Sequence, residues 1–140
     1  MKVEDIMTKQ VVTVSPGESV EVAARMLTHY NIGALPVCGG DGRLRGLVTD
    51  RDLVTRCLAA NRDPSRTLVR DIMSEGITAV QPDMDASVAA HLMGRQQVRR
   101  LPVVTEGKLC GMISLGDFAQ REDRVMDAAD ALMDISSNIR

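Results

Sequence analysis

The chain has 140 residues, of which 44% are hydrophobic and only 1% aromatic, and its formal net charge is −2. A chain of this length can enclose one aliphatic core, but it lacks the basic charge and the aromatic side chains that nucleic-acid binding uses. No apolar run approaches the roughly 20 residues of a membrane span, and Glu4 and Asp5 occupy positions that would be apolar in a signal peptide. We therefore expect a soluble, cytoplasmic protein with no nucleic-acid and no membrane partner.

Turn residues divide the first half of the chain into short elements. The β-branched run at residues 11–14 stops at Pro16, which is typical of a strand followed by a turn. Apolar side chains then recur at helical spacing until Asn31 and Gly33 interrupt them. The expected order is a strand (11–14), a helix (19–29), a strand (34–38), a hairpin turn (39–42), a strand (45–49) and a helix (50–60).

Two helices are expected to bury an apolar face. In the helix at residues 50–60, that face is formed by Leu53, Val54, Cys57 and Leu58. A last helix runs beyond residue 122, with Asp127, Asp130 and Asp134 largely on its other faces. Its apolar face is formed by Val125, Ala129, Leu132 and Met133. With no further chain to cover this face, we expect it to pack on its own domain or on a partner subunit.

The second half of the chain repeats the first. Residues 5–8 (Asp-Ile-Met-Thr) return as residues 71–74 (Asp-Ile-Met-Ser), an offset of 71 − 5 = 66. After a one-residue shortening the offset becomes 65, and residues 46–53 match residues 111–118. Self-similarity of this extent means a duplicated supersecondary unit. We expect an α+β fold in which two pseudo-symmetric β-α-β-β-α repeats pack through their sheets and an extended C-terminal helix follows. The expected division is a first repeat (1–60), a linker (61–67), a second repeat (68–122) and a helical extension (123–140).

The cysteines and histidines form no pattern typical of a disulfide framework or a metal site. Cys38, Cys57 and Cys110 are an odd number, include no CxxC pair and are not repeated, which fits a reducing cytosol. With His29 and His91 also unrepeated, nothing has metal-ligand spacing. A zinc site assembled from these residues across the fold or a dimer interface stays open as an alternative.

Each repeat ends with a Thr or Ser followed three residues later by an Asp. Thr49-x-x-Asp52 and Ser114-x-x-Asp117 both stand at an expected junction between a strand and a helix. One interpretation is purely structural, because this spacing is close to a capping box that satisfies the free amides of a helix start.

A second interpretation comes from a wider resemblance. Each repeat combines Asp-Ile-Met near its start, a Leu-Pro-Val strand, and a Gly followed by two apolar residues and the [Thr/Ser]-x-x-Asp motif. This combination resembles the cystathionine-β-synthase (CBS) domain, and two in tandem resemble the Bateman module. The match runs from residue 3 to about residue 120. It is similar to the modules of inosine-monophosphate dehydrogenases and of the regulatory subunit of AMP-activated kinase, and to bacterial members without a catalytic domain.

The resemblance implies two clefts that bind adenosine-containing ligands. In the family the motif Asp holds the ribose hydroxyls, the Thr or Ser lies on the phosphate side, and backbone groups hold the adenine. Such an Asp is suited to a diol because its carboxylate accepts two hydrogen bonds. The ligand-binding residues implied for this chain are Thr49 and Asp52 in one cleft, Ser114 and Asp117 in the other, and the backbone near Val14 and Ala34.

The resemblance also assigns a role to Arg99 and Arg100. These residues stand before the Leu-Pro strand of the second repeat, where family members carry basic residues that reach phosphates. They are expected to serve the cleft that contains Asp52, since the guanidinium fork pairs well with phosphate. The first repeat has Gly33 and Ala34 at these positions, so the Asp117 cleft lacks the cations. The structural alternative is a solvated turn with two exposed arginines.

The function expected from the sequence is that of a regulatory module, not an enzyme. It would bind AMP, ADP, ATP, NAD or S-adenosylmethionine, require no cofactor, form a homodimer, and pass the occupancy of its clefts to a regulated protein that the sequence does not name. A ligand-free dimerisation module is the alternative of another class, in which both motifs serve only as caps. An enzyme has the weakest support, because the chain has no P-loop and no adjacent nucleophile-base pair.

Overall fold

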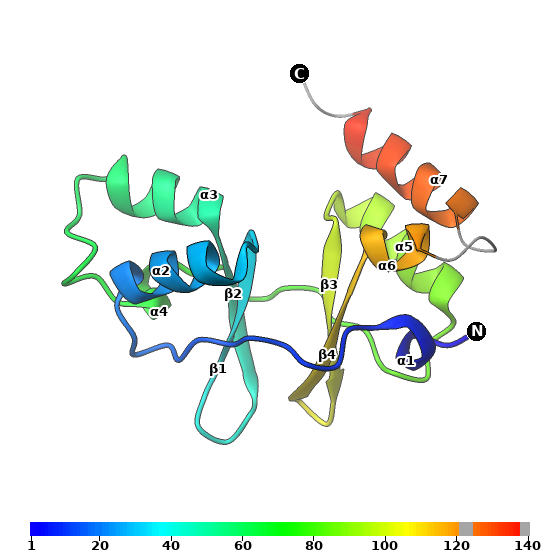
Figure 1. Cartoon of the computed structure of the whole chain (residues 1–140), viewed down its shortest axis with the longest axis horizontal. Coiled ribbons are helices and arrows are strands. Elements are labelled where there is room, and N and C mark those ends of the chain that lie inside the picture. The colour runs from blue at the N-terminus through cyan, green and yellow to red at the C-terminus, as the bar shows by residue number, and fades with distance from the viewer. Residues whose placement is uncertain (121–124, 138–140) are drawn as a thin grey trace. The chain divides into compact units, whose positions relative to one another are not determined.

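The computed structural model describes residues 1–120 and 125–137, which divide into two compact units (Figure 1). The first-repeat unit is Val12–Ile77. The second-repeat unit combines Met1–Val11 with the described residues from Thr78 onward. None of the described helices is long and apolar enough to cross a membrane.

The first-repeat unit is built around one antiparallel hairpin. Strands β1 (Ala34–Cys38) and β2 (Leu44–Thr49) pair along their whole length, and the turn between them uses Gly42 at φ 80°. Ser19 caps helix α2 (Val20–Tyr30), which ends at Asn31 in the left-handed region. The other helices of this unit are α3 (Asp50–Asp52), η1 (Leu53–Leu58) and α4 (Val69–Ile72).

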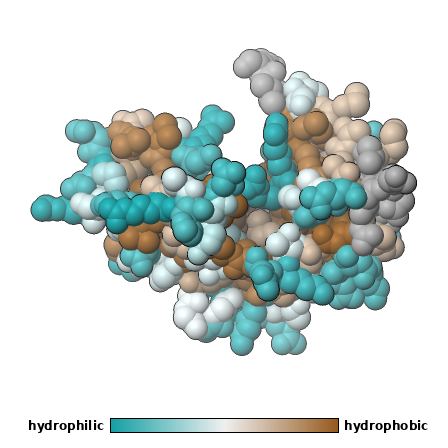
Figure 2. All heavy atoms as spheres, viewed as in Figure 1, coloured by the Kyte–Doolittle hydropathy of each residue, from teal (hydrophilic) through white to brown (hydrophobic). Residues whose placement is uncertain are grey.

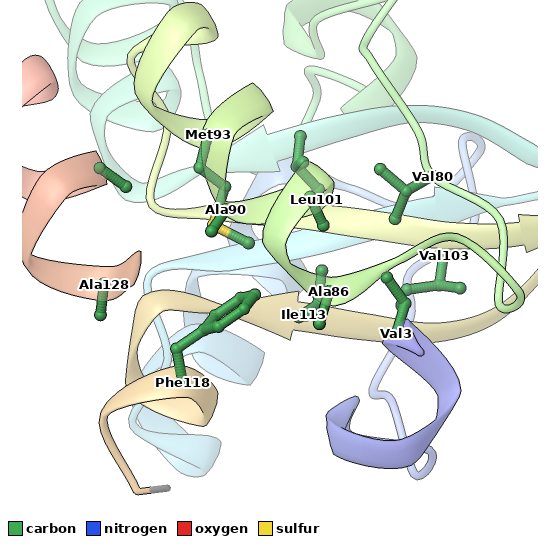
Figure 3. Close-up of a cluster of buried hydrophobic side chains, with 12 residues drawn as sticks. Val3, Val80, Ala86, Ala90, Met93, Leu101, Val103, Ile113, Phe118 and Ala128 are labelled. Atoms are coloured by element: carbon green, nitrogen blue, oxygen red, sulfur yellow. The ribbon is translucent and has the colours of Figure 1, made fainter. Parts of the chain in front are cut away.

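The second-repeat unit has the same hairpin, and the expected succession of helix, strand, turn, strand and helix is confirmed in both units. Strands β3 (Arg100–Thr105) and β4 (Lys108–Ser114) pair in the register of β1 and β2. Figure 3 shows its core, where Phe118, Leu101 and Ile113 gather between the sheet and the helices. The helices are α1 (Val3–Ile6), α5 (Ala86–Gln96), α6 (Leu115–Ala119) and α7 (Val125–Ser136).

Residues 11–14 do not form the expected strand. This segment meets β1 through one parallel bridge, in which the Val14 amide donates to the Pro36 carbonyl and the Cys38 amide donates to the Val14 carbonyl. The ladder cannot extend toward the N-terminus because Pro36 has no N–H to donate. The second repeat behaves alike, since Val80 bridges Val103 beside Pro102. The observed repeat is therefore one bridge, a helix, a hairpin and a helix.

The Asp-Ile-Met segment of each repeat packs in the unit that holds the other repeat's hairpin. Val3 of α1 is fully buried with Val103 in the second-repeat core (Figure 3). Val69 and Ile72 of α4 are buried in the first-repeat core. Neither short helix was predicted from the sequence. Each hairpin therefore depends on a short helix from the other repeat to complete its core.

The helix after β2 differs from the expectation in its buried side. Cys57 is fully buried, as expected, but Val54 and Leu58 are exposed. The reason is that η1 is a π-helix, whose wider turns change the angular spacing on which the α-helical prediction rested.

The last helix also buries a different face from the one expected. Ala128, Ala131 and Ile135 are buried, whereas Leu132 and Met133 are exposed. A Cβ on Gly94 of α5 would lie 2.9 Å from the Asp134 carboxylate and 3.4 Å from the Ala131 Cα, so α7 approaches α5 very closely. Only small residues fit such an approach, which selects the alanine face. The side chain of Val125 lies outside the described residues.

The motif glycines Gly46 and Gly111 should not tolerate a larger side chain, because the ends of the Asp-Ile-Met segments lie directly against them. We call these two segments (5–8 and 71–74) the exchanged segments, since each packs in the unit of the other repeat's hairpin. A Cβ on Gly46 would lie 2.6 Å from the Ser74 carbonyl oxygen, and one on Gly111 would lie 2.9 Å from the Thr8 carbonyl oxygen. We expect Gly46→Ala and Gly111→Ala each to destabilise the protein by about 1–3 kcal/mol, as overpacking does.

The measurement is urea unfolding followed by circular dichroism, with Gly40→Ala as the matched control. A Cβ on Gly40 would meet nothing within 4 Å, so this change should stay within about 0.5 kcal/mol of the parent. Equal stability of Gly46→Ala and Gly40→Ala would contradict the close crossing.

Candidate functional site

Both [Thr/Ser]-x-x-Asp motifs form capping boxes. The Thr49 hydroxyl accepts from the Asp52 amide at 3.1 Å, and the Asp52 Oδ2 accepts from the Thr49 amide at 2.9 Å. The same two bonds join Ser114 and Asp117, at 3.3 and 2.8 Å. The structural interpretation of the motifs is thus confirmed. It uses one oxygen of each carboxylate, so it does not exclude a ligand at the other.

The second oxygen of Asp52 faces Arg56. The Asp52 Oδ1 lies 3.8 Å from the Arg56 Nε, and the Asp52 side chain is only 13% exposed. Arg56 also donates through Nη1 to the carbonyls of Ile72 at 3.1 Å and Met73 at 3.3 Å, where α4 ends. Arg56 therefore joins the motif carboxylate to the exchanged segment within the first-repeat unit. Arg56 was not among the residues predicted for the site, although an Arg four positions after an Asp on a helix is a recognisable ion-pair spacing.

The second oxygen of Asp117 has a different neighbour. The Thr8 hydroxyl donates to the Asp117 Oδ1 at 3.5 Å, at the long limit of a hydrogen bond. Thr8 is held in place by paired backbone bonds with Met112 of β4. Ser74 stands at the repeat position of Thr8 and bridges Leu47 in the same manner. The Asp117 carboxylate thus contacts the end of one Asp-Ile-Met segment directly, and the Asp52 carboxylate is joined to the end of the other through Arg56.

Arg99 and Arg100 lie beside the motif of their own repeat. Arg100 is the register partner of Ser114 across the β3–β4 ladder, and the Arg99 carbonyl accepts from the Leu115 amide at 3.0 Å. Arg99 is exposed and Arg100 is half-buried. Their expected reach to the Asp52 cleft stays a prediction.

The two positions expected to hold adenine both lie beside a strand of the first hairpin. The amide and the carbonyl of Val14 both bond to β1, so neither is unpaired in this structure. Ala34 is buried and is the register partner of Thr49, which places it beside the Asp52 motif. Both residues stay predictions as ligand contacts.

The cysteines and histidines are not gathered into a metal site. Within residues 1–120 and 125–137, no group of three or more His, Cys, Asp or Glu side chains is placed to hold a metal ion. Cys57 is buried with its thiol donating to the Arg62 carbonyl, and the Cys110 thiol donates to the Val103 carbonyl. Burial and the nearby Asp41 carboxylate raise the pKa of the Cys38 thiol. A raised pKa disfavours the thiolate, which is the form that binds metals.

These features agree with a comparison against known families. A family model of the CBS domain matches residues 3–59 and again residues 69–124. The chain belongs to the CBS domain family. It is 40% identical over 134 residues to the CBS domain-containing protein YhcV of Bacillus subtilis, covering 96% of this chain and 94% of YhcV. It is 32% identical to an inosine-5′-monophosphate dehydrogenase of Methanocaldococcus jannaschii, where the match spans 92% of this chain but 25% of the dehydrogenase.

Solved structures of the family share the fold. Hypoxic Response Protein I with two coordinated zinc ions has a TM-score of 0.80 at 36% identity, covering 86% of this chain and 98% of that one. CBSX2 in complex with AMP has a TM-score of 0.76 at 30% identity, covering 85% and 93%. The CBS domain pair of MJ0100 with 5′-methylthioadenosine and S-adenosyl-L-methionine has a TM-score of 0.75 at 26% identity, covering 86% and 94%.

Proposed function

We propose that this CBS pair is a regulatory sensor that binds an adenosine-containing ligand and does no catalysis of its own. The observation that carries the proposal is the second oxygen of Asp52, which the capping box leaves unused and which lies 3.8 Å from the Arg56 Nε. This distance is longer than that of a charge-assisted hydrogen bond, so a ribose diol can compete with Arg56 for the oxygen. CBSX2 with AMP and MJ0100 with S-adenosylmethionine support the class of ligand, since both ligands contain adenosine.

Arg99 and Arg100 are proposed to bind the phosphate of a nucleotide ligand. Among the described residues, no ion pair uses either side chain, so both guanidinium groups are free for a ligand. Thr49, Ser114 and Asp117 complete the proposed contacts, with the backbone near Val14 and Ala34 on the adenine. AMP, ADP, ATP, NAD and S-adenosylmethionine all fit this description, and the arginines favour those that carry phosphate.

The regulatory step is proposed to be a shift between two packings of the module. A ligand changes such an equilibrium only as far as it binds one state better than the other. Arg56 provides a physical route, because a ligand that takes Asp52 would leave Arg56 held only by the α4 carbonyls. The proposed assembly is a cytoplasmic homodimer that acts on a partner protein.

A ligand-free interaction module is the second candidate. It is favoured by one observation, the complete capping boxes at both motifs, which account for both Asp residues without any ligand. Native mass spectrometry of freshly purified full-length protein separates the two functions. We expect a co-purified mass in the range of an adenine nucleotide or adenosyl compound. Zinc adducts would indicate instead the metal binding seen in Hypoxic Response Protein I.

Asp52→Asn should weaken ligand binding without removing the cap. Its amide oxygen can still accept from the Thr49 amide, but the charge and one acceptor are lost. Hydrogen bonds to a charged group are worth about 1.5–3 kcal/mol, so we expect at least a tenfold loss in AMP affinity by calorimetry. Asp117→Asn should cost less, because the first repeat, which would supply the cations of the Asp117 cleft, has Gly33 and Ala34 at those positions. Equal losses in both variants, or none, would contradict the proposed site.

Changing Arg99 and Arg100 together to Ala should distinguish phosphate binding from a solvated turn. We expect AMP and ATP to bind the double variant much more weakly, while adenosine binds it as it binds the parent, because only the nucleotides carry phosphate. Added salt should weaken AMP binding to the parent and hardly affect the variant. Equal AMP affinity in both proteins would remove the reason for a phosphate-bearing ligand. Thermal unfolding without ligand is the control and should change little.

A further inference from the structure

A thioether sulfur lies directly against each motif glycine. A Cβ on Gly111 would lie 2.6 Å from the Met7 Sδ, and one on Gly46 would lie 2.9 Å from the Met73 Sδ. Met7 and Met73 are the third residues of the two exchanged segments, and both are half-buried. The same contact is therefore made once in each unit, and neither sulfur leaves room for another heavy atom between itself and its strand.

The nine methionines of the chain differ in how far solvent reaches them. Met126 is 71% exposed and Met133 is 70% exposed, whereas Met93 is fully buried. Figure 2 shows brown and tan atoms at the surface of each unit, so apolar side chains do reach water. Met7 and Met73 lie between the two extremes, because each packs on the core of its unit and keeps part of its surface exposed. A small oxidant can therefore reach both in the folded protein.

The end of each exchanged segment is held to its strand by a single bridge. Thr8 and Met112 exchange two backbone hydrogen bonds in one unit, and Ser74 and Leu47 exchange two in the other. The helices that precede these bridges, α1 and α4, have four residues each and are too short to persist by themselves. The packing of the methionine before each bridge therefore contributes substantially to holding the segment in place.

Oxidation of the thioether to a sulfoxide would remove this packing. The sulfur attacks a peroxide, an S=O bond forms and the O–O bond breaks. The sulfur loses two electrons, and the peroxide gains them and leaves as water or an alcohol. The new oxygen is a hydrogen-bond acceptor that is costly to bury without a partner. It cannot point at the strand, because the glycine already touches the sulfur. The side chain therefore has to turn toward water and give up its contacts with the core.

We propose that Met7 and Met73 are modification sites at which a peroxide loosens the exchanged segments. Loosening would reach the motifs, because the Met73 carbonyl accepts from Arg56 and the neighbour of Met7, Thr8, donates to Asp117. A methionine sulfoxide reductase reverses the change, since two thiols form a disulfide while the oxygen leaves as water. The exposed methionines of α7 would also be oxidised, but they have little packing to lose. The inference does not depend on the proposed ligand.

The first test is peptide mass spectrometry of the full chain during treatment with hydrogen peroxide. We expect Met7 and Met73 to be oxidised after Met126 and Met133 and before Met93, because reactivity follows exposure. Circular dichroism identifies the samples that are still folded, and only these count. The proposal is overturned if Met7 and Met73 stay reduced for as long as Met93 does.

The second test asks whether these two sulfurs carry the effect. Oxidation of the parent should lower its urea midpoint and speed hydrogen exchange at the Thr8 and Ser74 amides roughly tenfold, and methionine sulfoxide reductase should restore both. Met7→Leu combined with Met73→Leu should resist, because leucine has a similar volume and no sulfur. Met126→Leu combined with Met133→Leu is the matched control and should stay as sensitive as the parent. Equal sensitivity of the Met7/Met73 double variant, or resistance of the control, overturns the proposal.

The two single variants keep the test decisive if the double variant fails to fold. After oxidation, Met7→Leu should keep exchange slow at the Thr8 amide while the Ser74 amide becomes fast. Met73→Leu should show the reverse, because each sulfur serves the unit in which it packs. Loss of protection at both amides in both single variants would overturn the proposal.

Discussion

The backbone pairing between each Asp-Ile-Met segment and a motif strand is the constraint on which the rest of the structure depends. Thr8 and Met112 exchange hydrogen bonds of 2.8 and 2.9 Å, and Ser74 and Leu47 exchange bonds of 2.8 and 3.0 Å. This pairing brings α1 and α4 to the hairpins whose cores they complete. It also places the segment ends beside the motif carboxylates. The same pairing of segment and strand therefore builds both the core and the candidate site. It is possible because a glycine, Gly46 in β2 and Gly111 in β4, lies where each segment passes the strand.

Each motif carboxylate serves two purposes because it has two oxygens. The Oδ2 of Asp52 caps the helix, and its Oδ1 faces Arg56 on the same helix. The structural and functional interpretations of the motif are thus compatible, which the spacing of the residues could not reveal. Helix η1 begins directly after Asp52 and bears the exposed side chains of Val54 and Leu58.

The predictions that succeeded were those that local interactions decide. The two hairpins, and a helix that begins near Ser19 and is interrupted at Asn31, follow from turn residues and short-range hydrogen bonds. One prediction that failed is the strand at residues 11–14, which Pro36 limits to a single bridge. The others concern which side of a helix is buried. On η1 the i→i+5 turns altered the spacing, and on α7 both sides are apolar, so hydrophobicity alone could not select the face against Gly94.

The sequence by itself determined the family, the duplicated α+β repeat and the motif residues Thr49, Asp52, Ser114 and Asp117. These are recorded in residue identity and in contacts close along the chain. The tertiary structure alone decided that α1 and α4 each complete the hairpin of the other repeat. It also decided that Arg56 reaches the carbonyls at the end of α4 and that Thr8 neighbours the Asp117 carboxylate. Thr8 and Asp117 are 109 residues apart. No local pattern encodes such a pair, because only the folded backbone brings its members within hydrogen-bonding distance.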